Sequence, residues 1–471
     1  MFKVIIPVYN VEKYLKEAVD SVITQSLPFS DNVKIYLIND KSTDGSLNIC
    51  NEYQKKYPDN IFVHVFEKNQ GVAIARNYGL KMAKQNESDI VVFLDADDKF
   101  DKDMLKKAKE FFEKYPDIDM ATTERFFFDA QEGPHKANWR FEDKEIVDIN
   151  EDFTYPQYFV GGLFIKGKAL KKFRFNKKMD FWEDALAVNK VLLSCEKYGL
   201  IKDAIYYYRR REDESSLVDS SWRSKDRYDK FLRQGYKKLM RYCRLKKGKV
   251  IPYIQFVVAY HLRTYLLEGN QDVIMEMISE EELPKFKKRL QSVLKSIDDD
   301  VILSINTRMP VIEGLLSLKY GRKITMDTEY KDGDLVFSYN GQEFDRLSEK
   351  TIRILGWQDK EGYEGMLRGR FSTPVYAMKE DDYIFAEGNG QRVKSIRHGC
   401  KKRIKIFGKN VRNYKYAGFA IDIPEDWISF RWGIHLEDGD VMLNEVDVND
   451  LGERTVKEED EDGTDNWFRW S

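Results

Sequence analysis

The sequence predicts an α/β protein in which a domain built on a mostly parallel sheet is followed by a helical region and an all-β domain. Over the first hundred residues, short apolar runs alternate with amphipathic segments, which is typical of parallel strands covered by helices. Segments rich in Lys, Leu and Tyr with helical spacing occupy residues 223–304, and short strand-like runs between Gly and Asp turns follow. We therefore expect domains at residues 1–222, 223–308 and 309–471, a number that suits a chain of 471 residues.

Four buried strands and three helices alternate in the first part. The strands are "FKVIIPVYN" (2–10), "VKIYLIND" (33–40), "IFVHVFEK" (61–68) and "DIVVFLDADD" (89–98). The helices between them are expected at residues 11–27, 44–58 and 71–85. In the first helix, one apolar stripe contains Tyr14, Leu15, Ala18, Val19 and Val22. This spacing places the stripe against the sheet.

The pattern is less regular after residue 100. Helices are expected at residues 101–115 and 181–199, short strands and loops between them, and a strand over "IKDAIYYYRRR" (201–211). Strand-like runs in the last domain are "GDLVFSYNG", "RIKIFG", "YAGFAIDI" and "ISFRWGIHL". They indicate a sandwich-like all-β domain. Its five tryptophans are expected to lie mostly in the core: Trp357, Trp427, Trp432, Trp467 and Trp470.

Composition excludes several classes of protein. The formal net charge is −2, so no overall basic field indicates binding to nucleic acid. The four cysteines are widely scattered, which indicates neither a zinc site nor a disulfide framework and favours a reducing compartment. The longest apolar region, from Val250, is a poor membrane span because Pro, Gln, His and Arg interrupt it. We expect a cytoplasmic protein, with peripheral contact to the membrane left open.

Polar residues follow all four predicted strands, in "PVYN", "IND", "EKNQG" and "DADD". The carboxyl ends of parallel strands form one edge of a sheet, where ligands bind. Asp95 and Asp97 lie two residues apart, so in an extended chain both carboxylates lie on one side. They suit Mn²⁺ or Mg²⁺ carrying a diphosphate. The alternative is helix capping, which we favour for Asp98 and Asp101 but not for Asp95 and Asp97.

These motifs, in this order, resemble family 2 nucleotide-sugar glycosyltransferases with the GT-A (Rossmann-like) fold. The resemblance implies that the loop Pro7, Val8, Tyr9 and Asn10 lies along the nucleotide base. It implies that Asp40 binds uracil and that Asn69 and Arg76 contact the nucleotide. It also implies that Asp95, Ala96 and Asp97 form the DxD motif that holds ribose, metal and diphosphate. The alternatives are an Asx turn for Asp40 and a surface helix charge for Arg76.

A general base is needed to deprotonate the acceptor hydroxyl in inverting transfer. The candidate is "WED", Trp182 to Asp184, at the start of an apolar helix. Negative charge is common at a helix start for capping alone. The family resemblance implies that Asp184 is the base and that Glu183 positions the base or the acceptor. Trp182 would stack on a sugar or belong to the core.

The leaving diphosphate needs positive charge or hydrogen-bond donors. We assign this role to Arg211 and Ser216 in "YYYRRREDESSL", although the stretch lacks the His or QxxRW motif of related enzymes. "VGGLF", with Gly161 and Gly162, would let the backbone approach the acceptor or would form an ordinary turn.

The sequence thus predicts an inverting, metal-dependent glycosyltransferase that uses a UDP-sugar donor. The acceptor would be a hydroxyl of a bacterial polysaccharide, polyol-phosphate polymer or lipid-linked glycan. The architecture resembles that of poly(ribitol phosphate) glycosyltransferases, whose C-terminal modules support trimers, so the last domain would form a homo-oligomer or bind glycan. The alternatives are a non-catalytic glycan-binding scaffold and a nucleotidyltransferase. The second would normally show a Gly-rich phosphate loop, which "PVYNVEKY" does not contain.

Overall fold

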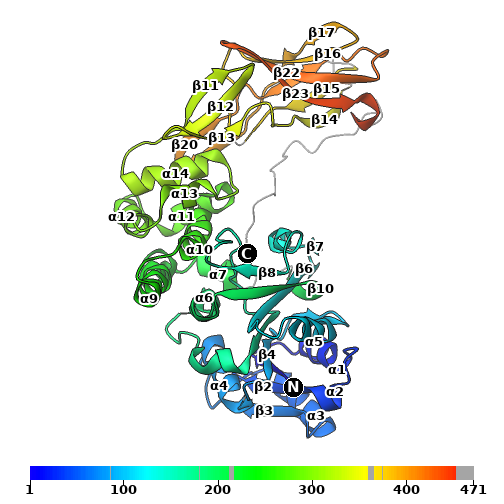
Figure 1. Cartoon of the computed structure of the whole chain (residues 1–471), viewed down its shortest axis with the longest axis vertical. Helices are drawn as coiled ribbons and strands as arrows, with labels where there is room; N and C mark the ends of the chain where they lie inside the picture. Colours follow the sequence, from blue (N-terminus) through cyan, green and yellow to red (C-terminus); the bar gives the residue numbers. More distant parts are fainter. Residues whose placement is uncertain (85, 180, 212–216, 359–364, 374, 452–471) are drawn as a thin grey trace. The chain divides into compact units, whose positions relative to one another are not determined.

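The structure, a computed structural model, describes residues 1–84, 86–179, 181–211, 217–358, 365–373 and 375–451 (Figure 1). The described chain divides into two units. The first contains residues 1–259 and 296–298, and the second contains residues 260–295 and those from Asp299 onward.

The first unit is built on one ten-stranded mixed sheet (Figure 1). Its main path runs in the order β3-β2-β1-β4-β9-β6-β10-β5, with β7 on β6 and β8 on β10. Strands β3, β2, β1 and β4 are parallel, β9 is antiparallel to both β4 and β6, and β10 is parallel to β6. The strands are β1 (Phe2–Val8), β2 (Val33–Asn39), β3 (Ile61–Val65), β4 (Ile90–Phe93), β5 (Lys99–Phe100), β6 (Met120–Asp129), β7 (Gly133–Pro134), β8 (Ile146–Asp148), β9 (Leu163–Lys166) and β10 (Lys197–Arg210). The mixed α/β sheet predicted from the sequence is confirmed.

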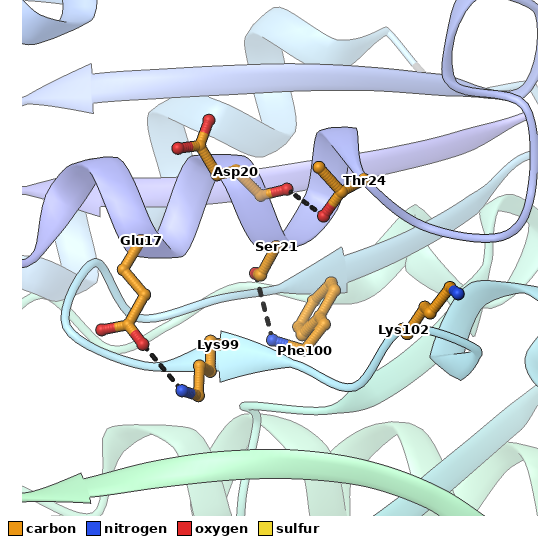
Figure 2. A pocket seen from close by; sticks show the side chains of 7 residues that line it. All are labelled: Glu17, Asp20, Ser21, Thr24, Lys99, Phe100 and Lys102. Atoms are coloured by element: carbon orange, nitrogen blue, oxygen red, sulfur yellow. Dashed lines mark hydrogen bonds and ion pairs between the residues drawn. The ribbon is translucent and has the colours of Figure 1, made fainter.

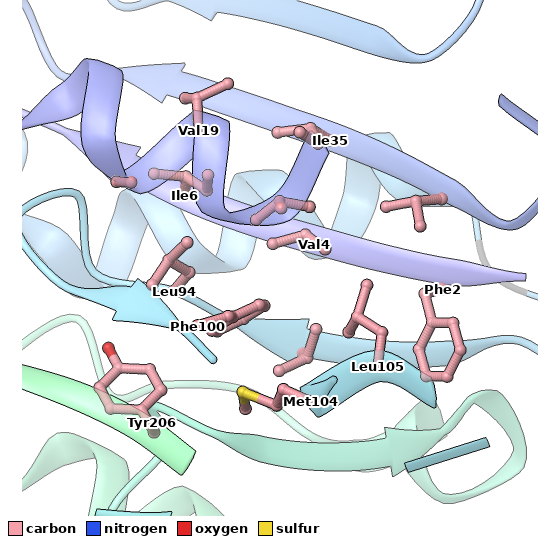
Figure 3. Packing of buried hydrophobic residues seen from close by; sticks show 14 of the residues in the cluster. Phe2, Val4, Ile6, Val19, Ile35, Leu94, Phe100, Met104, Leu105 and Tyr206 are labelled. Atoms are coloured by element: carbon pink, nitrogen blue, oxygen red, sulfur yellow. The ribbon is translucent and has the colours of Figure 1, made fainter. Parts of the chain in front are cut away.

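Helices cover the sheet and connect its strands. They are α1 (Leu15–Ile23), α2 (Phe29–Asn32), α3 (Ser46–Lys56), α4 (Val72–Ala83), α5 (Met104–Lys114), η1 (Lys136–Phe141), η2 (Gly167–Lys172) and α6 (Glu183–Cys195). The predicted stripe of α1 is buried at Leu15, Ala18, Val19 and Val22. Figure 3 shows Val19 packed with Val4 and Ile6 of β1 in the main core, which also includes Phe100 and Leu105.

Gly79 explains how closely α4 approaches the other face of the sheet. A Cβ at this position would lie 2.4 Å from Cγ2 of Ile5, so only glycine fits.

The boundary between α6 and β10 differs from the prediction, which extended the helix to residue 199. Helix α6 ends at Cys195, and Glu196 follows with φ of 62°. Residues 197–201 instead pair with β8 and β6. Strand pairing therefore overrides the helical pattern of this segment.

The region expected as a helical spacer is divided between the two units. Helix α7 (Leu217–Trp222) precedes this region. The region's own helices are short: α8 (Lys225–Tyr228), η3 (Leu232–Lys237), α9 (Lys238–Lys247), α10 (Pro252–Leu262), η4 (Arg263–Leu266), η5 (Glu268–Asn270), α11 (Gln271–Met277), α12 (Leu283–Leu294) and α13 (Asp299–Leu303). The unit boundary falls within α10. The segment thus does not form one spacer. In the described residues, no helix is long and apolar enough to cross a membrane.

The second unit combines the later helices with antiparallel sheets. Residues 309–320, expected at the start of the β domain, form helix α14 (Met309–Tyr320), and the first strand begins at Asp327. Gly314 of α14 packs against Leu266 and Ile406, which ties the helices to the β part of the unit.

The strands of the second unit form four sheets, in the orders β11-β12-β13, β14-β15-β21-β18, β17-β16-β22-β23 and β19-β20. They are β11 (Asp327–Lys331), β12 (Asp334–Tyr339), β13 (Gln342–Arg346), β14 (Arg353–Trp357), β15 (Leu367–Arg370), β16 (Tyr383–Gly388), β17 (Gln391–Lys394), β18 (Ile396–Arg397), β19 (Arg403–Ile406), β20 (Lys409–Asn413), β21 (Gly418–Ile421), β22 (Ser429–Leu436) and β23 (Gly439–Asp447), followed by η6 (Val448–Leu451). The rings of Phe419 and Trp432 lie 5.6 Å apart and join the two four-stranded sheets as a sandwich. Trp357, Trp427 and Trp432 are buried, as predicted, whereas Trp467 and Trp470 lie outside the described residues.

Candidate active site

The loop after β1 and the loop after β2 are joined by hydrogen bonds. The amide N–H of Thr43 donates to Oδ1 of Asn10 at 2.8 Å, and the amide N–H of Asn10 donates to Oγ of Ser42 at 3.1 Å. Asn10 has φ of 51°, which asparagine tolerates better than most residues. In the same loop, Pro7 is half-buried, Val8 is buried and the Tyr9 ring is 48% exposed. The predicted base-binding loop is therefore braced, and it presents an exposed aromatic ring.

Asp40 fastens the end of β2 to the loop before α4. It is buried, and its two carboxylate oxygens accept from the amide N–H groups of Gln70 and Gly71, both at 2.7 Å. Gly71 has φ of +89°, which favours glycine. These bonds replace the Asx turn that was the alternative for Asp40. Asn69 is exposed, and its Nδ2 donates to the Asp40 carbonyl at 3.4 Å.

The DxD residues follow β4, and each carries a guanidinium partner. Nη2 of Arg76 lies 2.7 Å from Oδ1 of Asp95, and Nη2 of Arg211 lies 2.5 Å from Oδ2 of Asp97. Ala96, between them, is buried. Burial raises the pKa of Asp97, and the charge of Asp95 adds to the rise while Arg211 opposes it. Two carboxylates thus lie close enough to interact, with positive charge on both sides.

Arg76 is neither a surface charge nor a solvent-facing group. It is 6% exposed, and Nη1 lies 3.0 Å from Oε1 of Glu183 while Nη2 holds Asp95. The guanidinium therefore joins the end of β4 to the start of α6. The structure brings Arg76, Asp95 and Glu183 together, although 107 residues separate Arg76 from Glu183.

The start of α6 places two carboxylates side by side in different environments. Glu183 is buried against Arg76, whereas Asp184 is half-buried. Within the described residues, the one hydrogen bond to the Asp184 side chain comes from the amide N–H of Ala185, at 2.7 Å. Burial raises the pKa of both groups, and Arg76 opposes the rise in both. Asp184 is thus the member of the cluster without a cation in direct contact.

Trp182 precedes this pair with φ of 63° and is 5% exposed. Its ring packs edge-on against Phe231 and Tyr236, with centroids 5.7 and 5.2 Å away. Trp182 is therefore a core residue, and stacking on a sugar, the alternative, is excluded in this conformation.

The prediction that Asp98 caps the next helix is wrong. The Asp98 carboxylate is 2% exposed and accepts from the Tyr206 hydroxyl at 2.6 Å and from the Arg209 amide N–H at 2.8 Å. Burial raises the pKa of Asp98 well above its usual value, and the charges of Asp97 and Asp95 add to the rise. Asp101, by contrast, accepts from the amide N–H of Asp103 just before α5, close to the predicted capping position.

Strand β10 supplies the basic side of the site. Arg211 reaches Asp97, and Nε of Arg209 donates to the Asp97 carbonyl at 2.8 Å. Arg209 also forms ion pairs with Glu17 and Asp129. Ser216, predicted to act with Arg211, lies outside the described residues.

Two site residues were missed from the sequence. The Tyr206 hydroxyl donates to Asp98 and accepts from the Asp95 amide N–H at 3.2 Å, so it lies directly beneath the DxD loop. Arg125 on β6 lies over the rings of Phe159 and Tyr206, at 4.3 and 4.8 Å from their centroids. Burial raises the pKa of Asp184, and the charge of Arg125 opposes that rise. The one available signal was the period-two alternation of β6 and β10, which directs Arg125 and Tyr206 to defined faces.

The two glycines of "VGGLF" allow the backbone to pack closely against neighbouring side chains. A Cβ on Gly161 would lie 2.8 Å from the Tyr206 hydroxyl oxygen, and one on Gly162 would lie 2.6 Å from Oγ1 of Thr123. Gly162 also has φ of +70°. These contacts favour close packing on Tyr206 over approach of an acceptor.

Replacing Tyr206 with Phe should weaken the DxD loop. The change removes a buried hydroxyl that bonds a carboxyl and a backbone amide, so we expect a loss of about 1–3 kcal/mol of unfolding free energy. Sugar transfer should fall as well, because Asp95 loses its backbone support. Urea unfolding and initial rates would measure both. Tyr207→Phe is the matched control, since Tyr207 is the next residue of β10 and half-buried; an equal effect there would contradict the assignment.

A divalent cation fits the donor chemistry of the DxD residues. The carboxylates of Asp95 and Asp97 are hard oxygen ligands. Besides burial, repulsion from the Asp95 charge raises the pKa of Asp97, and a bound cation would reduce that repulsion. No group of three or more His, Cys, Asp or Glu residues arranged for a metal occurs in the described part of the chain. A cation here would therefore take its other ligands from donor phosphates and water.

A hollow of about 540 Å³ lies beside α1 (Figure 2). Glu17 and Lys99 pair across it. It is lined by Glu17, Asp20, Ser21, Thr24, Lys99, Phe100 and Lys102. No residue predicted to bind donor or metal lines it.

Comparisons with known proteins agree with this geometry. Residues 3–174 match the family model described as glycosyl transferase family 2. The chain is 31% identical over 450 residues to the minor teichoic acid biosynthesis protein GgaA of Bacillus subtilis (strain 168), covering 95% of this chain and 97% of GgaA.

Two solved structures share the fold. The crystal structure of S. aureus TarS matches with a TM-score of 0.62 and 17% identity, over 94% of this chain and 77% of that one. The structure of S. aureus TarS 1-349 in complex with UDP-GlcNAc matches with a TM-score of 0.54 and 21% identity, over 73% and 99%. Together with the near full-length relative, these matches show that the chain belongs to glycosyl transferase family 2 and is a glycosyltransferase.

Proposed function

We propose that this glycosyltransferase acts with inversion and with a divalent metal, moving a sugar from a UDP-sugar to a hydroxyl of a teichoic-acid-type polymer. One observation carries the proposal: Arg76 joins Asp95 of the DxD motif to Glu183, beside Asp184. A carboxylate proposed to bind metal and a candidate base are thus held in one cluster around the buried Arg76. Family membership sets aside the nucleotidyltransferase and the non-catalytic scaffold.

Asp184 is the general base in this proposal. It is half-buried, and no cation among the residues that the structure describes contacts it directly, so its carboxylate is available to an acceptor hydroxyl. Burial raises its pKa and so makes it a stronger base than an exposed aspartate. Glu183, held by Arg76, is a positioning residue. Direct displacement by the deprotonated hydroxyl would invert the anomeric carbon, which NMR of the product would report.

The donor would lie across the strand ends. The exposed Tyr9 ring and the braced loop at Asn10 provide a surface for the base, and Asp40 fixes the loop that carries Asn69. The choice of uridine is supported by the TarS fragment that was solved with UDP-GlcNAc. Asp95 and Asp97 would hold Mn²⁺ or Mg²⁺, which would neutralise charge on the leaving diphosphate.

Arg211 is the protein cation next to that diphosphate, because its guanidinium already lies on Asp97. The bond from Arg209 to the Asp97 carbonyl keeps β10 against the DxD loop. Charge that develops on the leaving UDP would therefore meet a positioned guanidinium. Ser216 stays a proposal for the same role.

The acceptor class rests on the named relative, a minor teichoic acid biosynthesis protein. Such an acceptor would be a polyol-phosphate polymer or a lipid-linked glycan, made in the cytoplasm. For the second unit, self-association or glycan binding stays a proposal.

Thermal shift against a panel of nucleotide sugars with Mn²⁺ tests the donor and metal assignment. One UDP-sugar should raise the melting temperature, since a ligand at 100 times its Kd stabilises by about 2.7 kcal/mol. Chelation of the metal or Asp97→Ala should abolish the shift. Asp59→Ala is the control, because Asp59 is exposed and distant in sequence from the DxD. A shift that survives both treatments would refute the metal site.

A further inference from the structure

The segment from η3 through α9 carries an unusual concentration of positive charge. Residues 230–250 contain nine Lys and Arg residues and no Asp or Glu, whereas the whole chain has a formal net charge of −2. The basic residues are Lys230, Arg233, Lys237, Lys238, Arg241, Arg244, Lys246, Lys247 and Lys249. Three of these cations, Lys230, Arg233 and Lys247, form ion pairs with carboxylates outside the segment, so the local charge is compensated only in part.

Part of this charge forms one stripe with an apolar residue. Helix α9 buries Leu239, Met240 and Cys243. At 3.6 residues per turn, four exposed residues of α9 fall within an arc of about 120° on the opposite side, and exposed Lys246 lies outside this arc. These four residues, which we call the basic stripe, are Lys238, Arg241, Arg244 and Leu245.

Leu245 distinguishes this stripe from an ordinary solvated face. Its side chain is 77% exposed, the highest value among the large apolar residues of the described chain. It lies between Arg244 and Lys246, so apolar surface and positive charge are presented to solvent together. Basic residues beside an exposed leucine match the two components of a membrane interface, anionic headgroups and apolar acyl chains.

The stripe is firmly attached to the helix of the proposed base. Helix α9 packs beside α6 (Figure 1), and Lys247 pairs with Glu196, just past the end of α6. Near the start of α6, Trp182 packs against Tyr236 of η3. A surface that binds the stripe therefore also sets the orientation of α6 relative to that surface.

We propose that the basic stripe docks the enzyme on an anionic lipid membrane. Lysine and arginine side chains would lie among the lipid phosphates, and Leu245 would enter the interface. Each basic residue near such a surface adds favourable electrostatic energy. The exposed leucine favours lipid over a soluble polyanion, because a phosphodiester chain in water offers no apolar phase to a leucine.

Co-sedimentation of the full chain with vesicles tests the proposal. We expect binding to phosphatidylcholine vesicles containing about 30% phosphatidylglycerol, weakening as salt rises, and little binding to phosphatidylcholine alone. The triple variant Lys238→Gln/Arg241→Gln/Arg244→Gln should lower the partition coefficient about 100-fold, at about fivefold per charge. Leu245→Ser should lower it several-fold with the charge unchanged.

The matched control is Lys401→Gln/Lys405→Gln/Lys409→Gln, which removes three exposed charges from the second unit. It should bind vesicles like the unchanged chain. Equal loss in both triple variants, no loss in either stripe variant, or no vesicle binding at all would overturn the proposal. It would also be overturned if the stripe variants lost binding only to a soluble polyglycerol phosphate. Circular dichroism checks folding, and Leu245→Ser gives a second variant should the triple one fail to fold.

Discussion

Asp184→Asn is expected to reduce kcat for sugar transfer by about 10²–10⁴-fold, the range that a general base contributes. The amide keeps the size of the side chain and its bond to the Ala185 amide N–H but cannot accept the acceptor proton. Binding of the UDP-sugar should persist, because Asp184 does not hold the donor in the proposed site. Initial rates and the thermal shift with donor would separate the two effects.

Two further variants test whether the loss is specific to Asp184. Asp143→Asn removes an exposed aspartate and should leave kcat unchanged. Glu183→Gln should reduce kcat by less than Asp184→Asn, since Glu183 is engaged by Arg76 and acts through position. Near-normal transfer by a folded Asp184→Asn enzyme would remove this residue from the mechanism, and a larger loss in Glu183→Gln would assign the proton to Glu183.

The parallel strands and their polar ends could be predicted because their signals are local. Apolar runs and helical stripes repeat within a few residues, and the loops that follow them meet at one sheet edge by geometry alone. Asp95 and Asp97 were chosen on this basis, and Glu183 from its helix start and the family resemblance. The structure pairs Asp95 and Glu183 with Arg76, and Asp97 with Arg211.

Contacts between distant segments could not be predicted in the same way. Asp98 has the local pattern of a helix cap, yet its partner Tyr206 lies 108 residues later. Residues 197–201 have helical surroundings, yet pairing with β6 and β8 makes them a strand. The helices after residue 223 carry no signal of which unit each one joins, because apolar stripes do not specify their partners.

Arg76→Met is expected to destabilise the first unit by about 3 kcal/mol and to abolish transfer. Arg76 is buried, and its loss leaves Glu183 without a cation in a buried site, which costs about 3–5 kcal/mol. The lower end applies because Asp95, the other partner, has a side chain 33% exposed and reaches solvent. Calorimetry of the full chain would measure stability, and Lys81→Met, an exposed charge on the same helix, is the control.

The pH dependence of this loss follows from the pKa of Glu183. Burial and the Asp184 charge already raise this pKa, and removing Arg76 should raise it further. A group with a raised folded pKa stabilises when protonated. The stability difference between Arg76→Met and the unchanged chain should therefore shrink as pH falls toward about 7, the raised pKa of Glu183 in the unchanged chain, and stay level below it. Arg76→Met/Glu183→Gln should regain part of the stability at neutral pH without regaining transfer. A difference independent of pH would show that Arg76 acts by packing, because the charges of its carboxylate partners, Asp95 and Glu183, would link its loss to protons.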